Sequence, residues 1–449
     1  LDGTNSGRHA LSVVFLLSVA FLGTMYFSFY PNNLLQGWSM TRILIIIAFL
    51  FATPARAGDL QRGHEAAIAG DFKGAVNHWQ PLAAEGNAEA QYLLAKLYSF
   101  GQGVPQDYSV TIKLFKKAAA QGHAQAQNDL GWMYYNGQGV EQSYQDALKW
   151  YSIAADQGLI LAQKNLGLMY LDGIGVVRDG QEAAKWFRRA ADREDPWAAG
   201  YLGITYLEGI DVSTDFKAAS EWFMRAAQQN NPLGQWGRGV MLQLGWDEEP
   251  QDLKGAKKWF EKAADQGMPA ALHELAFLYE SGHGVRQDEK AAFRLYTRAA
   301  EQGFPNSQVN LALMYLNGRG TRKNLEVAAD WLALASESHY PPAQSLLGEL
   351  YSNGDGVKQN FEKALEMYQL AAMAGFSKAH YEIGKMYVLG RGVKKDNLRA
   401  YMHFEIASTL GLDETPVLKN LSSINLSSAE IAKAEQMAEK CINQNFLNC

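Results

Sequence analysis

The chain has 449 residues, 47% of them apolar and 20% charged, so it is long enough for two or three domains with a large buried core. Its 41 basic and 47 acidic residues give a formal charge of −6, and lysine and arginine form no cluster, which argues against nucleic acid as a partner. The 42 glycines against 12 prolines indicate frequent turns in an ordered chain.

Residues 40–57 have the pattern of a secretory signal peptide. Met40 and Arg42 open a short positive segment, the apolar run ILIIIAFLFA follows, and Ala55 and Ala57 stand in an A-x-A frame. We expect cleavage after Ala57, so the remainder of the chain is predicted to be exported.

The stretch upstream of this signal, residues 1–39, has two interpretations. Residues 10–30 form an uncharged run long enough to span a bilayer, so they could anchor the chain in a membrane. Alternatively, residues 1–39 are an upstream extension of the gene start, since the chain begins with Leu1 and a complete signal begins at Met40. We favour the second interpretation, and both predict export.

A pair of glycines separated by one residue recurs along the chain. Successive pairs begin 36 residues apart, except for one interval of 73 residues between positions 209 and 282. That interval holds an irregular repeat that starts at Gly245 and has one inserted residue. A fixed period of this size predicts a stacked array of repeats. The segments are GQGV at 101 and 137, GIGV at 173, GIDV at 209, GHGV at 282, GRGT at 318, GDGV at 354 and GRGV at 390.

The segment before each glycine pair predicts an amphipathic helix. A tyrosine stands three residues before the pair, leucine or isoleucine four residues before the tyrosine, and usually alanine eight residues before it, as Ala162, Leu166 and Tyr170 illustrate. Residues four and eight apart share one face of a helix, so this face is predicted to be buried. The glycines would end the helix by taking positive φ and allowing a tight reversal.

A second helix is predicted after each glycine pair. Bulky pairs such as Trp186-Phe187 are predicted to fill the space between repeats, and alanine pairs such as Ala190-Ala191 would let neighbouring helices approach closely. A phosphate-binding loop would need a preceding strand and a downstream Lys-Ser/Thr, so the glycine pair reads as a connector between helices instead. The predicted N-terminal caps of the second helices are Asp107, Ser143, Asp179, Asp215, Asp252, Asp288, Asn324, Asn360 and Asp396.

We call the residues at equivalent positions of successive repeats a column. These columns resemble the Sel-one-like repeat family, a relative of the tetratricopeptide repeats. Residues 124–158, AQAQNDLGWMYYNGQGVEQSYQDALKWYSIAADQG, follow the family pattern closely. The resemblance implies an all-α fold in which paired antiparallel helices stack into an α-solenoid, a right-handed superhelix of 36-residue repeats. We expect about nine full repeats and an N-terminal partial one, in a continuous array over residues 58–411. Glu194 and Asn230 depart from the pattern, since a closing glycine is expected at both positions.

Both ends of the array are predicted to carry closing elements. Residues 59–86 look like a shortened helix pair. Residues 412–449 are expected to form a capping helix and a tail, because Ser427 and Glu430 make a capping box before a helical pattern. Cys441 and Cys449, the two cysteines of the chain, could close a small loop in an oxidising compartment.

No residues have the spacing of a catalytic or metal site. The nine histidines are scattered and the sequence has no H-E-x-x-H. Some cysteine-rich members of the resembled family are associated with penicillin binding, but this chain lacks a cysteine in every repeat, and it has no S-x-x-K, S-D-N or K-T-G. We therefore predict no enzymatic activity, no cofactor and no metal.

Candidate binding residues stand in columns predicted to be exposed. The columns two, six and nine residues before the tyrosine lie opposite the apolar face of the first helix. Aromatic side chains with a few charges suit a surface that binds protein or peptide, although a neighbouring repeat could cover several of them. These candidates are Tyr92, Trp132, Lys164, Trp197, Trp236, His273 and Tyr381.

The irregular repeat supplies two more candidates. Arg238 stands in the leucine column, where an unpaired buried arginine would be prohibitive. We therefore expect Arg238 to point to a partner, or the register to slip there. Trp246 begins an acidic segment, 246–249, that we interpret as a contact site at a bend of the superhelix. Simple decay of the repeat is the alternative explanation.

These features predict an exported, periplasmic and non-enzymatic scaffold. As the resemblance implies for bacterial proteins, it would bind a protein or peptide along its concave face, in envelope regulation or assembly. It would bind no nucleic acid, and would contact a membrane only through residues 10–30, if they are retained. One alternative is a protein that binds or hydrolyses cell-wall peptides or β-lactams, and another is a chaperone-like role in the export of surface polymers.

Overall fold

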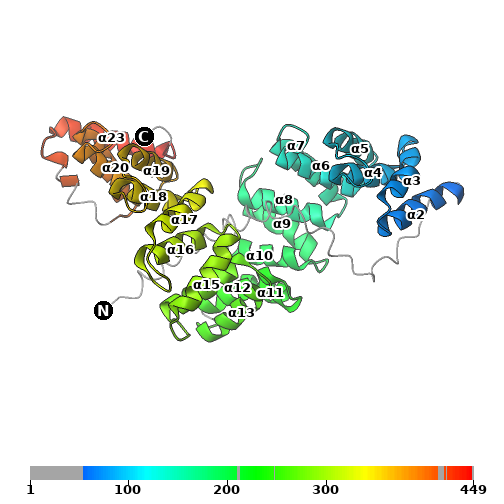
Figure 1. Cartoon of the computed structure of the whole chain (residues 1–449), viewed down its shortest axis with the longest axis horizontal. Coiled ribbons are helices and arrows are strands. Elements are labelled where there is room, and N and C mark those ends of the chain that lie inside the picture. The colour runs from blue at the N-terminus through cyan, green and yellow to red at the C-terminus, as the bar shows by residue number, and fades with distance from the viewer. Residues whose placement is uncertain (1–53, 210–212, 247, 413–418, 421, 447–449) are drawn as a thin grey trace. The chain divides into compact units, whose positions relative to one another are not determined.

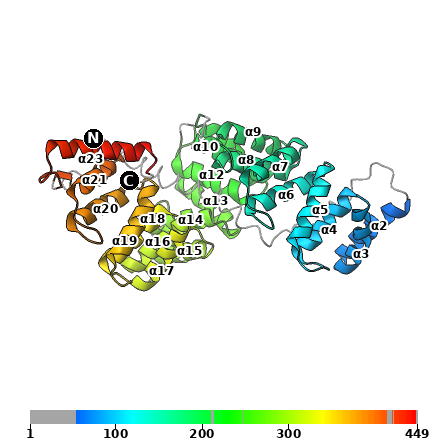
Figure 2. The same ribbon diagram turned by 90° about the horizontal axis from the view of Figure 1, so that it is seen from above.

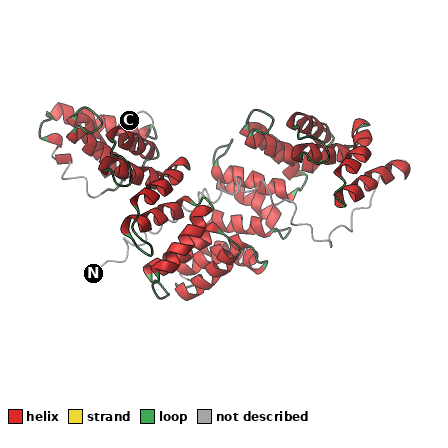
Figure 3. Ribbon diagram, viewed as in Figure 1, coloured by secondary structure: helices red, strands yellow, loops and turns green. Residues whose placement is uncertain are grey.

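The computed structural model describes residues 54–446, apart from 210–212, 247, 413–418 and 421, and these residues are helical with short connectors (Figure 3). Among these residues, β-type pairing is found as an isolated antiparallel bridge between Trp246 and Glu249. The helices are α2 (Pro54–Ile68), α3 (Phe72–Ala84), α4 (Ala88–Phe100), α5 (Tyr108–Ala120), α6 (Ala124–Asn136), α7 (Tyr144–Asp156), α8 (Ile160–Asp172), α9 (Gly180–Ala191), α10 (Pro196–Glu208), α11 (Phe216–Gln228), α12 (Pro232–Leu244), α13 (Leu253–Asp265), α14 (Pro269–Ser281), α15 (Glu289–Glu301), α16 (Pro305–Asn317), α17 (Leu325–Glu337), α18 (Pro341–Asn353), α19 (Phe361–Met373), α20 (Ser377–Leu389), α21 (Asn397–Thr409) and α23 (Ser428–Asn443).

The helices form two compact units, divided between Pro250 and Gln251. Within each unit, consecutive helices pack side by side in chain order (Figures 1 and 2). The predicted α-solenoid of paired helices is therefore confirmed. Where one continuous array is expected from the sequence, the structure has two units, and their division falls in the connector of the irregular repeat. The handedness of the superhelix stays a prediction.

The predicted caps open all nine second helices. Each of the nine residues is the N-terminal cap of its helix, and its side chain accepts a hydrogen bond from a backbone N–H of the first turn. In α5, Oδ1 of Asp107 accepts from the N–H groups of Ser109 and Val110 at 2.8 and 3.0 Å. The cap satisfies donors that have no partner inside the helix, which is why each second helix begins at this position.

The glycine pairs are confirmed as helix connectors. In the segment that follows α8, Gly173 and Gly175 take φ of 69° and 71°, in the left-handed region that glycine favours. Gly173 ends the helix, and its N–H donates to the carbonyl of Met169. A Cβ at position 175 would lie 2.6 Å from the Cβ of Tyr144 in the preceding repeat, so this glycine also permits close contact between repeats.

Three second helices end in the left-handed region without glycine. Glu194 and Asn230, which replace the closing glycine, take φ of 66° and 59°. His339, which the sequence analysis passed over, takes φ of 55° at the equivalent place after α17. The backbone geometry of the repeat is thus retained where the residue that favours it is missing, at a cost in conformational strain.

Neighbouring repeats are joined by a buried aromatic column. Its side chains lie almost completely out of solvent, and the first helix of the repeat approaches each of them closely. A Cβ at Gly167 of α8, for example, would lie 2.6 Å from the ring of Phe187, which explains a glycine directly after the buried leucine. The column comprises Tyr151, Phe187, Phe223, Phe260, Tyr296, Leu332, Tyr368 and Phe404.

Buried glutamines add a polar link between repeats. Nε2 of Gln91 donates to the carbonyl of Ala83 at 3.0 Å, and Gln127 donates to Ala119 in the same way in the next repeat. Gln163 and Gln308 repeat this contact at 3.2 Å. Each bond satisfies a carbonyl near the end of the preceding second helix, so it holds consecutive helices in register.

The ends of the array differ from each other. In the N-terminal pair, α2 and α3 have ordinary length, and the pair is shortened in its connector, 69–71, rather than in its helices. At the other end the capping box of Ser427 and Glu430 is confirmed, and α23 buries Ala434 and Ala438 against α21. Among the described helices, none is long and apolar enough to cross a bilayer.

Two predictions concern residues outside the described part. The signal peptide and the possible anchor at 10–30 lie almost wholly before Pro54, where α2 begins. Cys441 is buried in the last helix, whereas Cys449 is not among the described residues. Their disulfide therefore stays a prediction.

Candidate functional site

Two of the predicted surface residues are buried. Trp236 has 0% and His273 has 5% of its surface exposed, so the expectation that they face solvent is wrong. Nδ1 of His273 lies 2.9 Å from the hydroxyl of Ser307, in the following repeat, and its ring packs on Phe304. Trp236 packs edge-on against Phe223. Residues six positions before the tyrosine therefore face neighbouring helices. The periodicity of one helix cannot reveal this, because it does not show which other helices pack on it.

The other five candidates on the first helices are half-buried. Tyr92 stacks on His123 with ring centroids 4.6 Å apart, and Lys164 bridges to Asp195 at 3.1 Å, so stacked repeats cover part of each side chain. Trp132 is packed in the same way among buried residues of two clusters.

The remaining two show the same partial cover. Trp197 lies 6.5 Å from the ring of Tyr201, and Tyr381 lies 5.8 Å from the ring of Phe404. A role of these five residues in binding stays a prediction.

Arg238 is buried, and its partner is internal. Its guanidinium forms a two-pronged pair with Glu249, with N–O distances of 2.7 and 3.0 Å, and also donates to Ser220. Helix α12 begins 36 residues after α10, so the register does not slip. Both expectations for Arg238, an outward-pointing side chain and a shifted register, are therefore wrong, because the connector supplies a carboxylate.

Trp246 belongs to the same connector. It is half-buried, and its Nε1 donates to a carboxylate oxygen of Glu249 at 3.4 Å. Hydrogen bonding by Arg238, more than any other contact, holds the pKa of Glu249 below its usual range. Glu249 thus contacts Arg238 and Trp246 within the irregular repeat. Partner binding by Trp246 stays a prediction.

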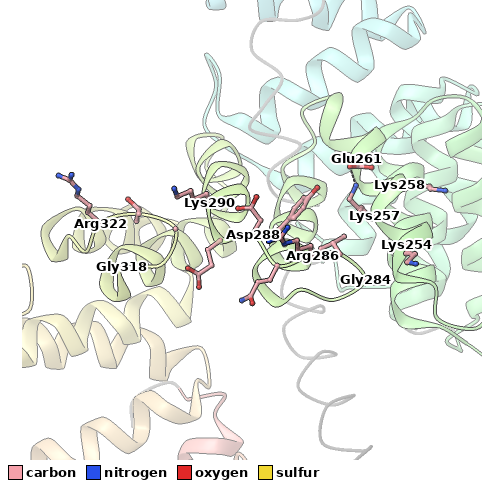
Figure 4. Close-up of a pocket in the computed structure, with 16 residues that line it drawn as sticks. Lys254, Lys257, Lys258, Glu261, Gly284, Arg286, Asp288, Lys290, Gly318 and Arg322 are labelled. Atoms are coloured by element: carbon pink, nitrogen blue, oxygen red, sulfur yellow. Dashed lines mark hydrogen bonds and ion pairs between the residues drawn. The ribbon is translucent and has the colours of Figure 1, made fainter.

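The second unit has a groove that several helices and connectors line (Figure 4). It runs between α13 and α15, with α14 beneath. The wider part, of about 1420 Å³, lies where the connectors 284–288 and 318–322 and the start of α15 approach the start of α13. A narrower part of about 460 Å³ continues over Leu275 and Tyr279 of α14. Tyr279 lines both parts, so they adjoin.

The narrower part of the groove is lined by a leucine, at position 295, where most repeats hold a tryptophan. In most repeats this column of the second helix holds tryptophan, and Trp186 and Trp331 pack against apolar clusters that include the preceding second helix. In α15 the column holds Leu295, which is half-buried and lines the groove. Leucine lacks the volume of an indole, so the space between α13 and α15 stays unfilled.

Among the side chains that line the groove, basic residues outnumber acidic ones. Lys257 is ion-paired with Glu261 on the same helix, and this hydrogen bond raises the pKa of Lys257 (Figure 4). Over the described residues, no group of three metal-ligating side chains is found, so the groove offers charge and apolar surface to a ligand. The basic side chains are Lys254, Lys257, Lys258, Arg286, Lys290, Arg294, Arg298 and Arg322, and the acidic ones are Glu261, Asp265, Asp288 and Glu289.

Sequence analysis missed this groove for a physical reason. Its basic residues come from two helices, α13 and α15, and from two connectors, spread over positions 254–322, so they form no cluster along the chain. The available signal was Leu295 in a column that otherwise favours tryptophan, together with three lysines at 254, 257 and 258.

The chain is similar to two solved structures. A Sel1 repeat protein from Oxalobacter formigenes is 32% identical over 69% of this chain and 90% of its own, with a TM-score of 0.46. A protective antigen with an SLR fold, present in uropathogenic Escherichia coli strains, is 28% identical over 87% of this chain and 93% of its own, with a TM-score of 0.49. No curated protein matches the chain.

The family model of the Sel1 repeat matches most of the chain. It matches residues 88–123, 124–159, 160–195, 198–231, 232–268, 269–304, 305–340, 341–376 and 377–412. These nine segments each hold one pair of helices, and the irregular repeat is among them. The chain therefore belongs to the Sel1 repeat family.

Proposed function

We propose that this chain is an exported, non-enzymatic scaffold that binds a protein partner in the bacterial cell envelope. Sel1 repeat proteins are generally scaffolds for protein interaction, which supports a binding role. The groove at Leu295 carries the proposal, because the stacking of repeats leaves Leu295, Ala291 and Tyr279 partly exposed there. Tyr92, Trp132 and the other half-buried aromatic side chains on the first helices would add a second contact surface.

The groove suits a macromolecular partner better than a small substrate. Its wider part exceeds the volume range of about 300–1,000 Å³ that is usual for small-molecule sites, and connectors form its wall on one side. Neither the groove nor the comparisons support the alternative function, which is to bind or hydrolyse cell-wall peptides or β-lactams.

The binding role can be tested by photo-crosslinking in the native cell. A photoreactive phenylalanine analogue replaces Lys258, an exposed residue of α13 that lines the groove. The matched control carries the analogue at Lys149, which is exposed at the same register of α7. We expect a discrete crosslinked protein at position 258 only. No discrete product, or the same products at both positions, would contradict a partner in the groove.

Export is tested separately, by N-terminal sequencing of the purified native protein. Cleavage after Ala57 predicts a mature chain that begins at Gly58. A chain that retains residues 40–57 would contradict the signal peptide.

A further inference from the structure

The groove carries charge opposite to that of the chain. Eight basic and four acidic side chains line it, whereas the whole chain has a formal charge of −6. In the wider part of the groove, five of the basic residues are exposed and, within the described part of the chain, form no ion pair. Their charge is therefore available to a ligand, and a groove of one sign attracts a partner of the other. These five are Lys254, Lys258, Arg286, Lys290 and Arg322.

Most of the basic residues line the wider part of the groove, whereas the leucines and alanines line the narrower part. These five basic residues line the wider part, at the connector end, and Arg294 and Arg298, which are also exposed and in no ion pair found among the described residues, line the narrower part. The narrower part is lined by Leu275, Leu295 and two alanines, Ala264 and Ala291, with Arg294 and Arg298 at its edge. A ligand that fills both parts needs acidic groups at one end and an apolar group beside them.

The acidic residues of the groove argue against a nucleic acid. Glu261 lines both parts and Asp265 lines the narrower one, so a continuous phosphate backbone would meet carboxylates along α13. A peptide can place an acidic side chain over each basic residue and direct backbone N–H donors to these carboxylates. Peptide recognition by basic side chains around an apolar pocket uses both kinds of contact.

Building on the proposed function, we infer that the groove between α13 and α15 binds an acidic peptide segment of its partner, with an apolar side chain seated on Leu295. The acidic side chains contact the basic residues at the connector end, and exclusion of water over Leu275 and Leu295 stabilises the apolar one. Binding then depends on salt concentration, since the charged contacts lie at an exposed rim.

The test uses the purified full chain and a fluorescein-labelled peptide of alternating glutamate and aspartate around a central pair of leucines. Fluorescence anisotropy measures its Kd, in parallel with the same peptide carrying lysine for each acid, the same peptide carrying serine for each leucine, and a labelled single-stranded RNA. We expect saturable binding of the first peptide, weaker binding of the serine peptide and none of the lysine peptide. RNA binding as tight as that of the acidic peptide would overturn the assignment to peptide.

Two pairs of variants locate the site. Leu295→Trp restores the residue of neighbouring repeats and should close the groove, whereas Leu114→Trp makes the same change at the same column of α5. Lys254→Glu with Lys258→Glu reverses two rim charges, and Lys113→Glu with Lys149→Glu changes the net charge equally on α5 and α7. Each groove variant should raise the Kd of the acidic peptide by about tenfold or more, and each control variant should raise it by less than about twofold. Equal effects of groove and control variants would overturn the site.

The outcomes separate this inference from the proposed function. A crosslinked partner at position 258 together with no binding of the acidic peptide would refute the acidic ligand and leave the scaffold intact. Peptide binding that survives Leu295→Trp, in a variant with an unchanged circular dichroism spectrum and melting temperature, would refute the groove as the site.

Discussion

Arg238 and Glu249 form a buried ion pair that replaces an apolar contact of the repeat. Arg238 has 5% of its surface exposed and stands where other repeats carry leucine, and both carboxylate oxygens of Glu249 accept from its guanidinium. The carboxylate comes from the connector that follows α12, eleven residues along the chain. The unusual residue in the helix and the unusual connector are thus the two partners of one interaction.

The pair predicts a non-additive double-mutant cycle. Glu249→Gln leaves a buried guanidinium without its counter-ion and should lower the free energy of unfolding by about 3 kcal/mol. Adding Arg238→Leu, which restores the residue of the leucine column, should recover the loss to within about 1 kcal/mol of the parent chain. Guanidinium denaturation of the four proteins measures the cycle. Additive losses would show that the two residues do not stabilise each other.

The buried histidines of the last repeat predict a loss of stability in acid. Nδ1 of His380 lies 3.1 Å from Nδ1 of His403. Burial lowers the pKa of His380 to about 4; burial, then the charges of His380 and Arg399, lower that of His403 to about 3. An unfolded histidine titrates near pKa 6.5, so between these values the unfolded chain binds more protons. Stability should therefore fall as the pH decreases from about 6.5 toward 4.

This pH dependence has a matched control. His380 stands in the column that holds glutamine in other repeats, and His403 in the tryptophan column. The double substitution His380→Gln with His403→Leu removes both titrating groups and keeps side chains that the repeat tolerates. The melting temperature of the parent should drop more between pH 7 and pH 5 than that of the variant. Parallel curves for the two proteins would rule out the histidine pair as the cause.

The connectors predict that the cost of replacing a glycine depends on what lies beside it. Gly175→Val forces a β-branched residue to positive φ and places its Cβ 2.6 Å from that of Tyr144. Gly122→Val meets the same backbone strain, at φ of 86°, with nothing within 4 Å. Strain alone costs about 1–3 kcal/mol, so Gly175→Val should lower the melting temperature clearly more than Gly122→Val. The double replacement of Gly173 and Gly175 should lower it further, and an unchanged melting temperature would contradict the connector role.

Two tryptophans of the first helices should respond differently to alanine. Trp236 is completely buried, so Trp236→Ala should cost about 3–5 kcal/mol of unfolding free energy. Trp132 is half-buried, so Trp132→Ala removes fewer contacts and should leave the fold largely intact. Urea denaturation followed by circular dichroism compares them. Similar losses of unfolding free energy in both variants would contradict the prediction that the buried tryptophan contributes more to stability than the half-buried one.

Much of the architecture follows from the sequence by itself. The 36-residue period, the caps such as Asp107 and the glycine pair at 173 and 175 determine where helices begin and end, because caps and left-handed turns act through residues close along the chain. The family follows from the same columns. Departures such as Glu194 are visible in the sequence, although the left-handed φ that they retain is not.

Only the tertiary structure decided which faces are covered and where the stacking stays open. Trp236 and His273 share a column with the half-buried Tyr92, yet neighbours from the next helices bury them. Arg238 has its counter-ion in a connector, and the groove depends on Leu295 together with basic residues from other helices. Helical period predicts the direction of a side chain, but its environment depends on side chains of adjacent repeats, whose volumes and charges no single repeat contains.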